Sequence, residues 1–260
     1  MLVPGINSAF EEYAMWLTRD GLSAVVASDR TDLGGPGKYD LYQTSRATLG
    51  APFGLLTPLS NVNTSDAETK PVLSTDGLQL YFSSDRPGSG SGYDIYMSTR
   101  TSLSTDFGSP ILVGSVSSTA ADLLGSVTAN GQLLYFDRPV SGNGRDIFVK
   151  NLQTTDAPVA VAELNSRSDE GHAILSDDLL TVYFASTRVG LSTTGSSADA
   201  NILVAHRTTP TATFTDLALV SELNTTSADI PAYLSPDGCT LYIDSDRSGT
   251  LHLWVAVKAK

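Results

Sequence analysis

The sequence predicts an all-β fold, a five-bladed β-propeller with four antiparallel strands in each blade. A pattern of short strands and tight turns recurs five times along the chain, and a period near fifty residues is typical of propellers and solenoids. Stripes of apolar residues at the helical period are scarce. A chain of 260 residues with 41% hydrophobic residues is also long enough to bury a large core as one all-β unit.

The second copy shows the repeat most clearly. A first strand begins at Glu68 and ends at the turn Asp76-Gly77, a second runs from Leu80 towards Arg86, and a third begins at Asp94. A fourth, outer strand completes the unit. The second strands align on Val25, Tyr81, Tyr135, Tyr183 and Tyr242, which are 56, 54, 48 and 59 residues apart.

Three polar positions keep a fixed spacing in every copy. An acid opens each first strand: Glu12, Glu68, Asp122, Glu170 and Asp229. Five residues before the acids stand Asn7, Asn63, Ser117, Asn165 and Asn224, and six residues after them stand Thr18, Ser74, Thr128, Ser176 and Ser235. Such regularity assigns these residues to the repeat itself.

Four of the first hairpins carry a turn signal: Asp20-Gly21, Asp76-Gly77, Asn130-Gly131 and Asp237-Gly238. Asp or Asn followed by Gly favours a tight turn because the turn needs a positive φ, which Gly adopts without strain. The fourth copy has Asp178-Leu179 in this place. We therefore expect its turn to be different or strained.

The two ends of the chain predict how the ring closes. The last copy stops at its third strand, Leu251–Val257, while Leu2–Asn7 aligns without gaps to the fourth strand Leu219–Asn224 of another copy. The N-terminal strand then completes the last blade and leaves no long edge unpaired. The blades of this single domain, residues 1–260, span about 8–63, 64–117, 118–165, 166–224, and 225–260 with 1–7.

Composition excludes several classes of protein. The net charge is −12 and the 16 Lys and Arg residues are scattered, so a nucleic acid backbone would be repelled. Cys239 is the single cysteine and offers neither a disulfide nor a zinc cluster. No apolar stretch is long enough to span a bilayer, and Met1–Phe10 does not read as a signal peptide. We expect a monomer without a transmembrane segment.

The repeat resembles the WD40-like motif of TolB-type and prolyl-oligopeptidase-type propellers. The residues that match it best are Ser235-Pro236-Asp237-Gly238 and the run Tyr81–Arg86, which is followed by Asp94-Ile95-Tyr96. The resemblance covers nearly the whole chain and is specific for the fold rather than for a function. It implies a bacterial protein that is periplasmic or secreted, in a class that includes protein-docking modules.

The recurring charged residues have a structural and a functional interpretation. The five acids fit caps of backbone N–H groups, or they form a ring at one mouth of the channel that contacts a ligand or holds calcium or magnesium. Arginines in the second strands recur with a polar residue at the third. These arginines, Arg30, Arg86, Arg138, Arg188 and Arg247, are expected to tie strands within a blade.

Residues that depart from the repeat are the stronger functional candidates. Lys70 and His172 stand two positions after the acid, and Trp16 and Tyr233 stand four positions after it. Blades one and five are neighbours in a closed ring, so Trp16 and Tyr233 are expected to lie close together. The two rings either anchor a ligand near a mouth or pack between blades.

These observations favour a non-catalytic scaffold that binds a peptide, a protein or a small ligand at the channel mouth, without a cofactor. The alternative is a glycan-binding lectin or a glycosidase-like enzyme that uses the acidic mouth. Catalysis is the weaker hypothesis, because the acids occupy equivalent positions in the repeat and a hydrolase needs two carboxyls in different environments.

Overall fold

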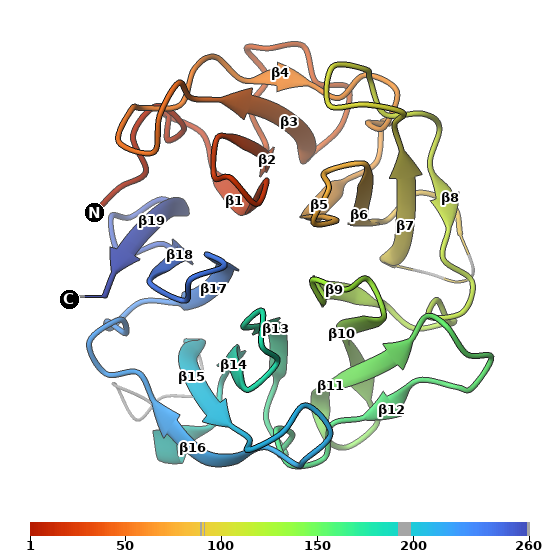
Figure 1. Ribbon diagram of the computed structural model, residues 1–260, viewed down its shortest axis with the longest axis vertical. Helices are drawn as coiled ribbons and strands as arrows, with labels where there is room; N and C mark the ends of the chain where they lie inside the picture. The colour runs from red at the N-terminus through yellow and green to blue at the C-terminus, as the bar shows by residue number, and fades with distance from the viewer. Residues whose placement is uncertain (89, 91, 192–198, 259–260) are drawn as a thin grey trace.

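The computed structural model describes residues 1–88, 90, 92–191 and 199–258 and shows five blades around a central channel (Figure 1). Blade one contains β1 (Glu12–Leu17), β2 (Ser23–Ser28), β3 (Asp40–Ser45) and β4 (Thr57–Pro58). Blade two contains β5 (Glu68–Leu73), β6 (Gln79–Ser84), β7 (Asp94–Thr99) and β8 (Ile111–Leu112). Blade three contains β9 (Leu123–Val127), β10 (Leu133–Val140), β11 (Gly144–Asn151) and β12 (Val159–Ala160). Blade four contains β13 (Glu170–Leu175), β14 (Thr181–Ser186), β15 (Asn201–His206) and β16 (Thr215–Leu219), and blade five contains β17 (Asp229–Leu234), β18 (Thr240–Ser245) and β19 (His252–Val257).

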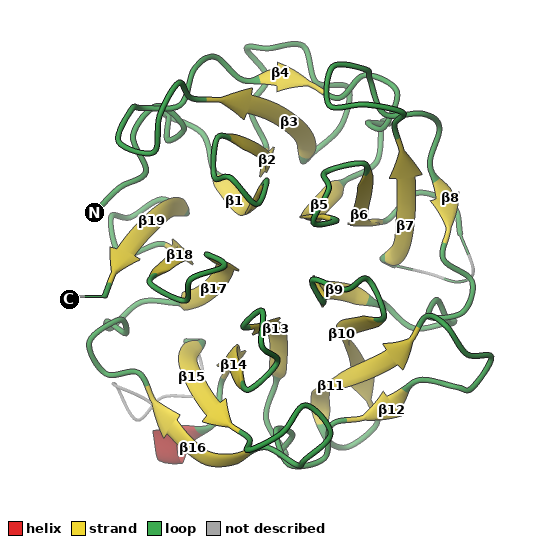
Figure 2. Ribbon diagram, viewed as in Figure 1, coloured by secondary structure: helices red, strands yellow, loops and turns green. Residues whose placement is uncertain are grey.

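The predicted fold class is confirmed. Four sheets have four antiparallel strands in chain order and the fifth has three. The helical content of the described residues is one short 3₁₀ turn, η1 (Val189–Leu191), as Figure 2 shows. The first strand of each blade lines the channel, and all five enter at the same end. We call the end where they begin the upper mouth and the opposite end the lower mouth.

Packing between neighbouring sheets explains the apolar runs of the inner strands. Val25 and Leu41 of blade one form one buried cluster with Leu73 and Phe82 of blade two. Strand β5 is buried at all six positions, because it is covered by a sheet on each face. A strand in that environment lacks the alternation of a half-exposed strand.

The N-terminal segment closes the ring, as the sequence predicts. Leu2 forms a β-bridge with Trp254. The backbone N–H of Val3 donates to the carbonyl of Leu253 at 3.0 Å, and that of Val255 donates to the carbonyl of Met1 at 2.7 Å. The pairing is a single β-bridge rather than a full strand, but the outer strands β4, β8 and β12 are themselves only two residues long.

A recurring asparagine fastens the outer segment to the third strand in four of the five blades. The side chain of Asn7 accepts from the N–H of Leu253 at 2.9 Å and donates to its carbonyl at 2.8 Å. An amide offers one acceptor and two donors on one plane, so it continues the hydrogen-bond ladder as a peptide unit would. The equivalent pairs are Asn63 with Leu41, Asn165 with Ile147, and Asn224 with Ile202.

The turn of the fourth blade is strained but not different. Leu179 adopts a φ of 64°, close to the 68° of Gly21 and the 69° of Gly77 in the equivalent turns. Its N–H donates to Ser176 as the glycine N–H groups do in the other blades. The turn therefore keeps the geometry of the other blades, although a left-handed φ costs leucine conformational free energy that glycine does not lose.

Replacing Asn7 by Ala tests the closure. The change leaves the N–H and the carbonyl of Leu253 without this partner, and we expect a loss of roughly 1–3 kcal/mol in the free energy of unfolding. For a chain of this size that corresponds to a melting temperature lower by several degrees, measured by circular dichroism.

Ser117 provides the matched control, since it occupies the equivalent position in blade two and its hydroxyl is buried without a hydrogen-bond partner among the described residues. Ser117→Ala should leave the melting temperature nearly unchanged. Equal melting of both variants and the wild type would show that Asn7 does not fasten the ring.

Candidate functional site at the channel

The five acids at the upper mouth are buried caps. Glu12, Glu68, Asp122, Glu170 and Asp229 are each 0–1% exposed. Glu68 shows the common pattern: it accepts from the backbone N–H of Thr64 at 2.8 Å, from the hydroxyl of that residue at 2.7 Å, and from Ser84 at 2.9 Å. This is the capping arrangement, one of the two interpretations that the sequence left open, and the carboxylates form no exposed ring.

The second-strand arginines bind these same acids. Arg86 lies 2.9 Å from Glu68 and also donates to the carbonyl of Val62 at 2.7 Å. Arg138, Arg188 and Arg247 pair likewise with Asp122, Glu170 and Asp229. The expected ties within blades are therefore present, but they join the second strand to the first. Blade one departs, because Arg30 pairs with Asp32 instead.

The lower part of the channel is filled by Trp16. Its ring lies 5.1 Å from that of Tyr233 in an edge-on arrangement, so the predicted proximity of these two residues is confirmed. Trp16 packs against four of the buried clusters between blades, and Tyr233 is 5% exposed. This contact is packing between blades, and it leaves a cavity of only about 50 Å³ at the lower mouth.

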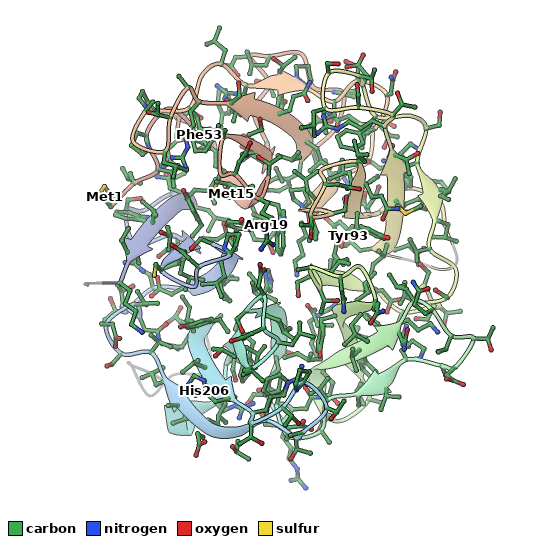
Figure 3. All side chains as sticks on the ribbon, in the orientation of Figure 1. Met1, Met15, Arg19, Phe53, Tyr93 and His206 are labelled. Atoms are coloured by element: carbon green, nitrogen blue, oxygen red, sulfur yellow. The ribbon has the colours of Figure 1, made fainter. Side chains whose placement is uncertain are left out.

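An ion pair crosses the lower mouth outside Trp16. Arg19 of blade one lies 2.6 Å from Asp177 of blade four, and Figure 3 shows Arg19 near the centre of the ring. The two ends of the channel thus differ in chemistry. The lower end is closed by the aromatic side chains of Trp16 and Tyr233 and by an ion pair. The other two candidates, Lys70 and His172, lie towards the upper end.

Lys70 and His172 are brought together near the upper mouth by an irregularity in the strands. The pairing of the first and second strands slips at or beside this position in all five blades, and Ala14, Lys70 and His172 have φ values of 54°, 50° and 54°. A β-bulge of this kind re-aims a side chain, and a positive φ at a residue other than glycine costs free energy. The side chain of Lys70 and the backbone N–H of His172 both approach the carboxylate of Asp137 in blade three.

Asp137 and Asp244 are functional candidates that the sequence interpretation missed. They occupy one position of the second strand, fifteen residues after the acid, where the other blades have Ala27, Ser83 and Ala185. The expectation that no carboxylate distinguishes a blade was therefore wrong. Aligning the second strands as closely as the first would have exposed both.

Asp137 is the centre of a charged cluster from three blades. Its carboxylate lies 2.6 Å from Arg145 Nε and 3.6 Å from Lys70 Nζ, and it accepts from the backbone N–H of His172 at 3.3 Å. The hydroxyl of Tyr13 lies 3.2 Å from His172 Nε2. Lys70 is 3% exposed and Asp137 2%, so these charges are held away from water.

Burial sets the protonation of the cluster. Burial lowers the pKa of Lys70 to about 8, although Asp137 opposes the change, and it holds the pKa of His172 well below its usual value. Burial alone would raise the pKa of Asp137, but Lys70 and Arg145 keep it below the ordinary range. Perturbed groups that gather in one place are typical of functional sites.

Asp244 completes the cluster from blade five. One carboxylate oxygen, Oδ1, accepts from the backbone N–H of Ala14 at 2.9 Å. The other, Oδ2, has no hydrogen-bond partner among the residues that the structure describes, and the same holds for Lys70 Nζ. Burial raises the pKa of Asp244 to about 7, against an opposing effect of Lys70. Below the cluster, a cavity of about 10 Å³ lined by Lys70, His172 and Trp16 interrupts the channel.

No group of three or more His, Cys, Asp or Glu side chains within the described ranges is arranged to hold a metal ion. Calcium or magnesium at the mouth stays a prediction. Across the same ranges the structure has no helix with the length and apolar character of a membrane span.

Comparison with known proteins supports the fold. No family model matches the sequence, and no curated protein matches it. Among solved structures, a putative TolB from Agrobacterium tumefaciens has a TM-score of 0.60 at 14% identity, over 96% of this chain and 78% of that one. The catalytic domain of a GH62 α-L-arabinofuranosidase from Coprinopsis cinerea has a TM-score of 0.59 at 11% identity, over 100% and 95% of the two chains. The periplasmic gluconolactonase of Pseudomonas aeruginosa has a TM-score of 0.52 at 15% identity, over 94% and 71%. The TolB-type propeller fold is thereby shown.

The pH dependence of stability tests the environment of Asp244. Between its unfolded pKa, about 3.9, and its folded pKa of about 7, the folded chain keeps a proton that the unfolded chain has lost. Rising pH through this window therefore lowers the free energy of unfolding. Asp244→Asn lacks this effect but keeps an oxygen for the N–H of Ala14.

We expect the melting temperature of Asp244→Asn to rise relative to the wild type from pH 4 to pH 7, and the difference to level off above that. Calorimetric scans of both proteins across this range give the measurement. Two parallel curves would mean that Asp244 is ionised normally and is reached by water.

Proposed function

We propose that this propeller is a non-catalytic binding module that takes a peptide, a protein segment or a small ligand at the upper mouth of its channel. The observation that carries the proposal is the convergence of polar side chains from all five blades at one place. Tyr13, Lys70, Asp137, His172 and Asp244 come from blades one to five in that order. All five depart from the residues found at the equivalent positions of most other blades.

The cost of this cluster supports a functional role. Buried charges lose hydration, and their mutual attraction seldom exceeds that loss by much. The scaffold already has a repeated and satisfied network of acids, hydroxyls and arginines, so it gains little from further buried charges. Residues that lower stability and break symmetry are the expected form of a binding site on a repeat protein.

Burial of both unusual carboxyls favours binding over hydrolysis. Asp137 is occupied by Arg145, Lys70 and the N–H of His172, and Asp244 is 0% exposed. A catalytic acid or base must reach the atom that it protonates or deprotonates. Neither carboxyl presents a free oxygen to a substrate at the surface.

A glycan-acting enzyme is the second candidate, and one observation favours it. Asp137 and Asp244 have pKa values that are shifted in opposite directions, which is the pattern of an acid and base pair. The arabinofuranosidase that shares the fold is an enzyme of that class.

The location of the protein is part of the proposal. Two of the similar structures are a TolB protein and a periplasmic gluconolactonase. A periplasmic or secreted location agrees with these likenesses and with the sequence resemblance, and we propose that the protein acts there as a monomer.

A thermal-shift screen tests the binding function. Short peptides and a panel of small metabolites are added to the wild type, and compounds that raise its melting temperature are tested again on Tyr13→Ala and His172→Asn. A ligand of the upper mouth should bind these variants about tenfold more weakly or worse, because each loses a contact of about 1–3 kcal/mol. Arg19→Ala alters only the lower mouth and should bind as the wild type does.

Hydrolysis of p-nitrophenyl α-L-arabinofuranoside, measured on the same proteins, addresses the enzyme alternative. We expect no turnover above background. Turnover that disappears in Asp137→Asn or Asp244→Asn would replace the binding proposal by the enzymatic one, and ligands unaffected by every upper-mouth variant would move the site elsewhere.

A further inference from the structure

An arginine covers the turn of the first hairpin in three of the five blades. It follows the third strand, and its Nε donates to a carbonyl of the turn: Arg46 to Gly21 at 2.8 Å, Arg100 to Gly77 at 2.8 Å, and Arg207 to Leu179 at 2.6 Å. Each guanidinium also lies over a phenylalanine ring of the same blade, at 4.5, 4.4 and 4.3 Å from the ring centre. A guanidinium in this place is therefore a recurring part of the scaffold.

Blade three lacks this arginine. Leu152 occupies the equivalent position, because its backbone N–H makes the same hydrogen bond to the hairpin as that of Arg100 does in blade two. The segment that follows is also shorter: it reaches the outer strand at Val161 after nine residues, whereas Arg100 is thirteen residues from Val113. The shorter segment has no phenylalanine. Both parts of the arginine contact are thus missing.

The turn of blade three is left open as a result. A Cβ atom placed on Gly131 would meet nothing within 4 Å among the described residues, whereas one on Gly77 would meet Leu103 at 2.8 Å and Arg100 at 3.6 Å. The carbonyl of Gly131 is the equivalent of the carbonyls that the arginines bind, and no hydrogen bond from the described residues reaches it.

A groove of about 780 Å³ lies beside this turn, between the neighbouring sheets of blades two and three (Figure 1). Its apolar wall is a row of residues paired across blade two: Tyr81, Met97 and Ile111. Leu152 lines it from blade three. The corresponding groove between blades one and two, which Arg100 lines, measures about 310 Å³. The volume of the larger groove lies within the range of ligand sites, about 300–1,000 Å³.

We infer that the groove between blades two and three binds a partner protein through an arginine side chain of that partner, flanked by an apolar residue. The guanidinium takes the place that the chain's own arginines take in other blades and donates to the carbonyl of Gly131. Its stem packs on Leu152 and Met97, and the apolar neighbour covers Ile111, which is 59% exposed. The inference goes beyond the proposed function and does not depend on it, since none of these residues belongs to the upper mouth.

The hydroxyl of Tyr81 supports the choice of a guanidinium. Tyr242 occupies the equivalent position in blade five, and Arg46 of blade one lies 3.5 Å from its hydroxyl, across the next junction of the ring. Tyr81 lines the groove and has no arginine opposite. A guanidinium has several donors in one plane and stacks on aromatic rings, which an ammonium does less well.

Charge complementarity favours a cation in this groove. Asp76 is the one charged residue among the described residues that line it. Hydrogen bonds from Ser74 and from the N–H of Leu78 hold the pKa of Asp76 below its usual value, so its carboxylate is ionised at neutral pH. The net charge of −12 attracts a basic segment from a distance.

Blade five shows why the inference is limited to one groove. It also lacks the arginine, and Gly238 is as open as Gly131. Lys258 stands at the equivalent position, however, and lines the groove of about 450 Å³ between blades four and five. Its ammonium repels a second cation.

An NMR titration of the ¹⁵N-labelled protein with the peptide acetyl-Ala-Leu-Arg-Ala-amide tests the inference. We expect the amide signals of Gly131 and Leu152 to shift. The same peptide with citrulline, which resembles arginine in shape but is uncharged, should bind about tenfold more weakly or worse, because hydrogen bonds from a charged donor are the stronger ones. This comparison uses the unchanged protein, so it does not depend on the folding of a variant.

Three variants locate the binding. Leu152→Arg introduces the residue that three other blades have, fills the groove from within, and should abolish the shifts. Ile111→Ser should weaken binding several-fold. Val159→Ser is the matched control, since Val159 is the equivalent residue of blade three, is 63% exposed, and lies on the blade that faces Arg207. It should bind like the wild type.

Three results would overturn the inference. The first is the absence of shifts at Gly131 and Leu152 at millimolar peptide. The second is binding that is equal for arginine and citrulline or that persists in Leu152→Arg, which would indicate general attraction to an acidic surface. The third is free L-arginine binding as tightly as the peptide, which would make the groove a small-molecule site instead of a docking site for a protein.

Discussion

The buried carboxylate at the start of each inner strand is the interaction on which the ring depends. It joins three segments of one blade: the loop before the strand, through an N–H and a hydroxyl; the second strand, through a serine; and the arginine that follows. Because the same acid recurs in five blades, five inner strands begin at the same height around the channel. A charge-assisted network of this kind is strong only when all its members are satisfied. Two blades vary this pattern. In blade one Arg30 turns to Asp32 and burial raises the pKa of Glu12. In blade three Arg138 stands where the other blades have the serine and binds Asp122 directly.

Much of this scaffold could be predicted from the sequence because the same residue pattern occurs in five copies. The acids, the asparagines and the turn residues stand at fixed spacing, and even the strain at Leu179 follows from comparing one copy with the others. Closure by Leu2 could be predicted in the same way, by aligning the first residues with the outer strand of another blade. Local geometry that is shared by all blades leaves a visible pattern in one chain.

The candidate site was harder to predict, and for physical reasons. Lys70 and His172 could be predicted because they depart from the repeat. Their common partner Asp137 lies on a second strand, where no polar residue recurs at this position in all five blades. The contact also depends on the left-handed φ of Lys70, which cannot be predicted from the residue type because lysine does not favour that conformation. The prediction that Trp16 and Tyr233 lie close together was right. Whether the two rings fill the channel or contact a ligand depends on how the neighbouring blades pack around them, which the sequence does not show. Contacts across the channel join residues from different copies, so periodicity carries no information about them.

The account separates residues that recur and build the fold from residues that depart from the repeat and serve the site. A symmetrised protein tests this most directly. Lys70→Leu, Asp137→Ser, Arg145→Tyr, His172→Leu and Asp244→Ser place at each position a residue that another blade has there, and Ser83 shows that serine still accepts the N–H from the next blade, at 2.8 Å. The free energy of unfolding, measured by denaturant titration, should equal or exceed that of the wild type, because apolar replacement of buried charges is often neutral or stabilising. A large loss of stability would contradict the account and make the cluster a structural part of the propeller.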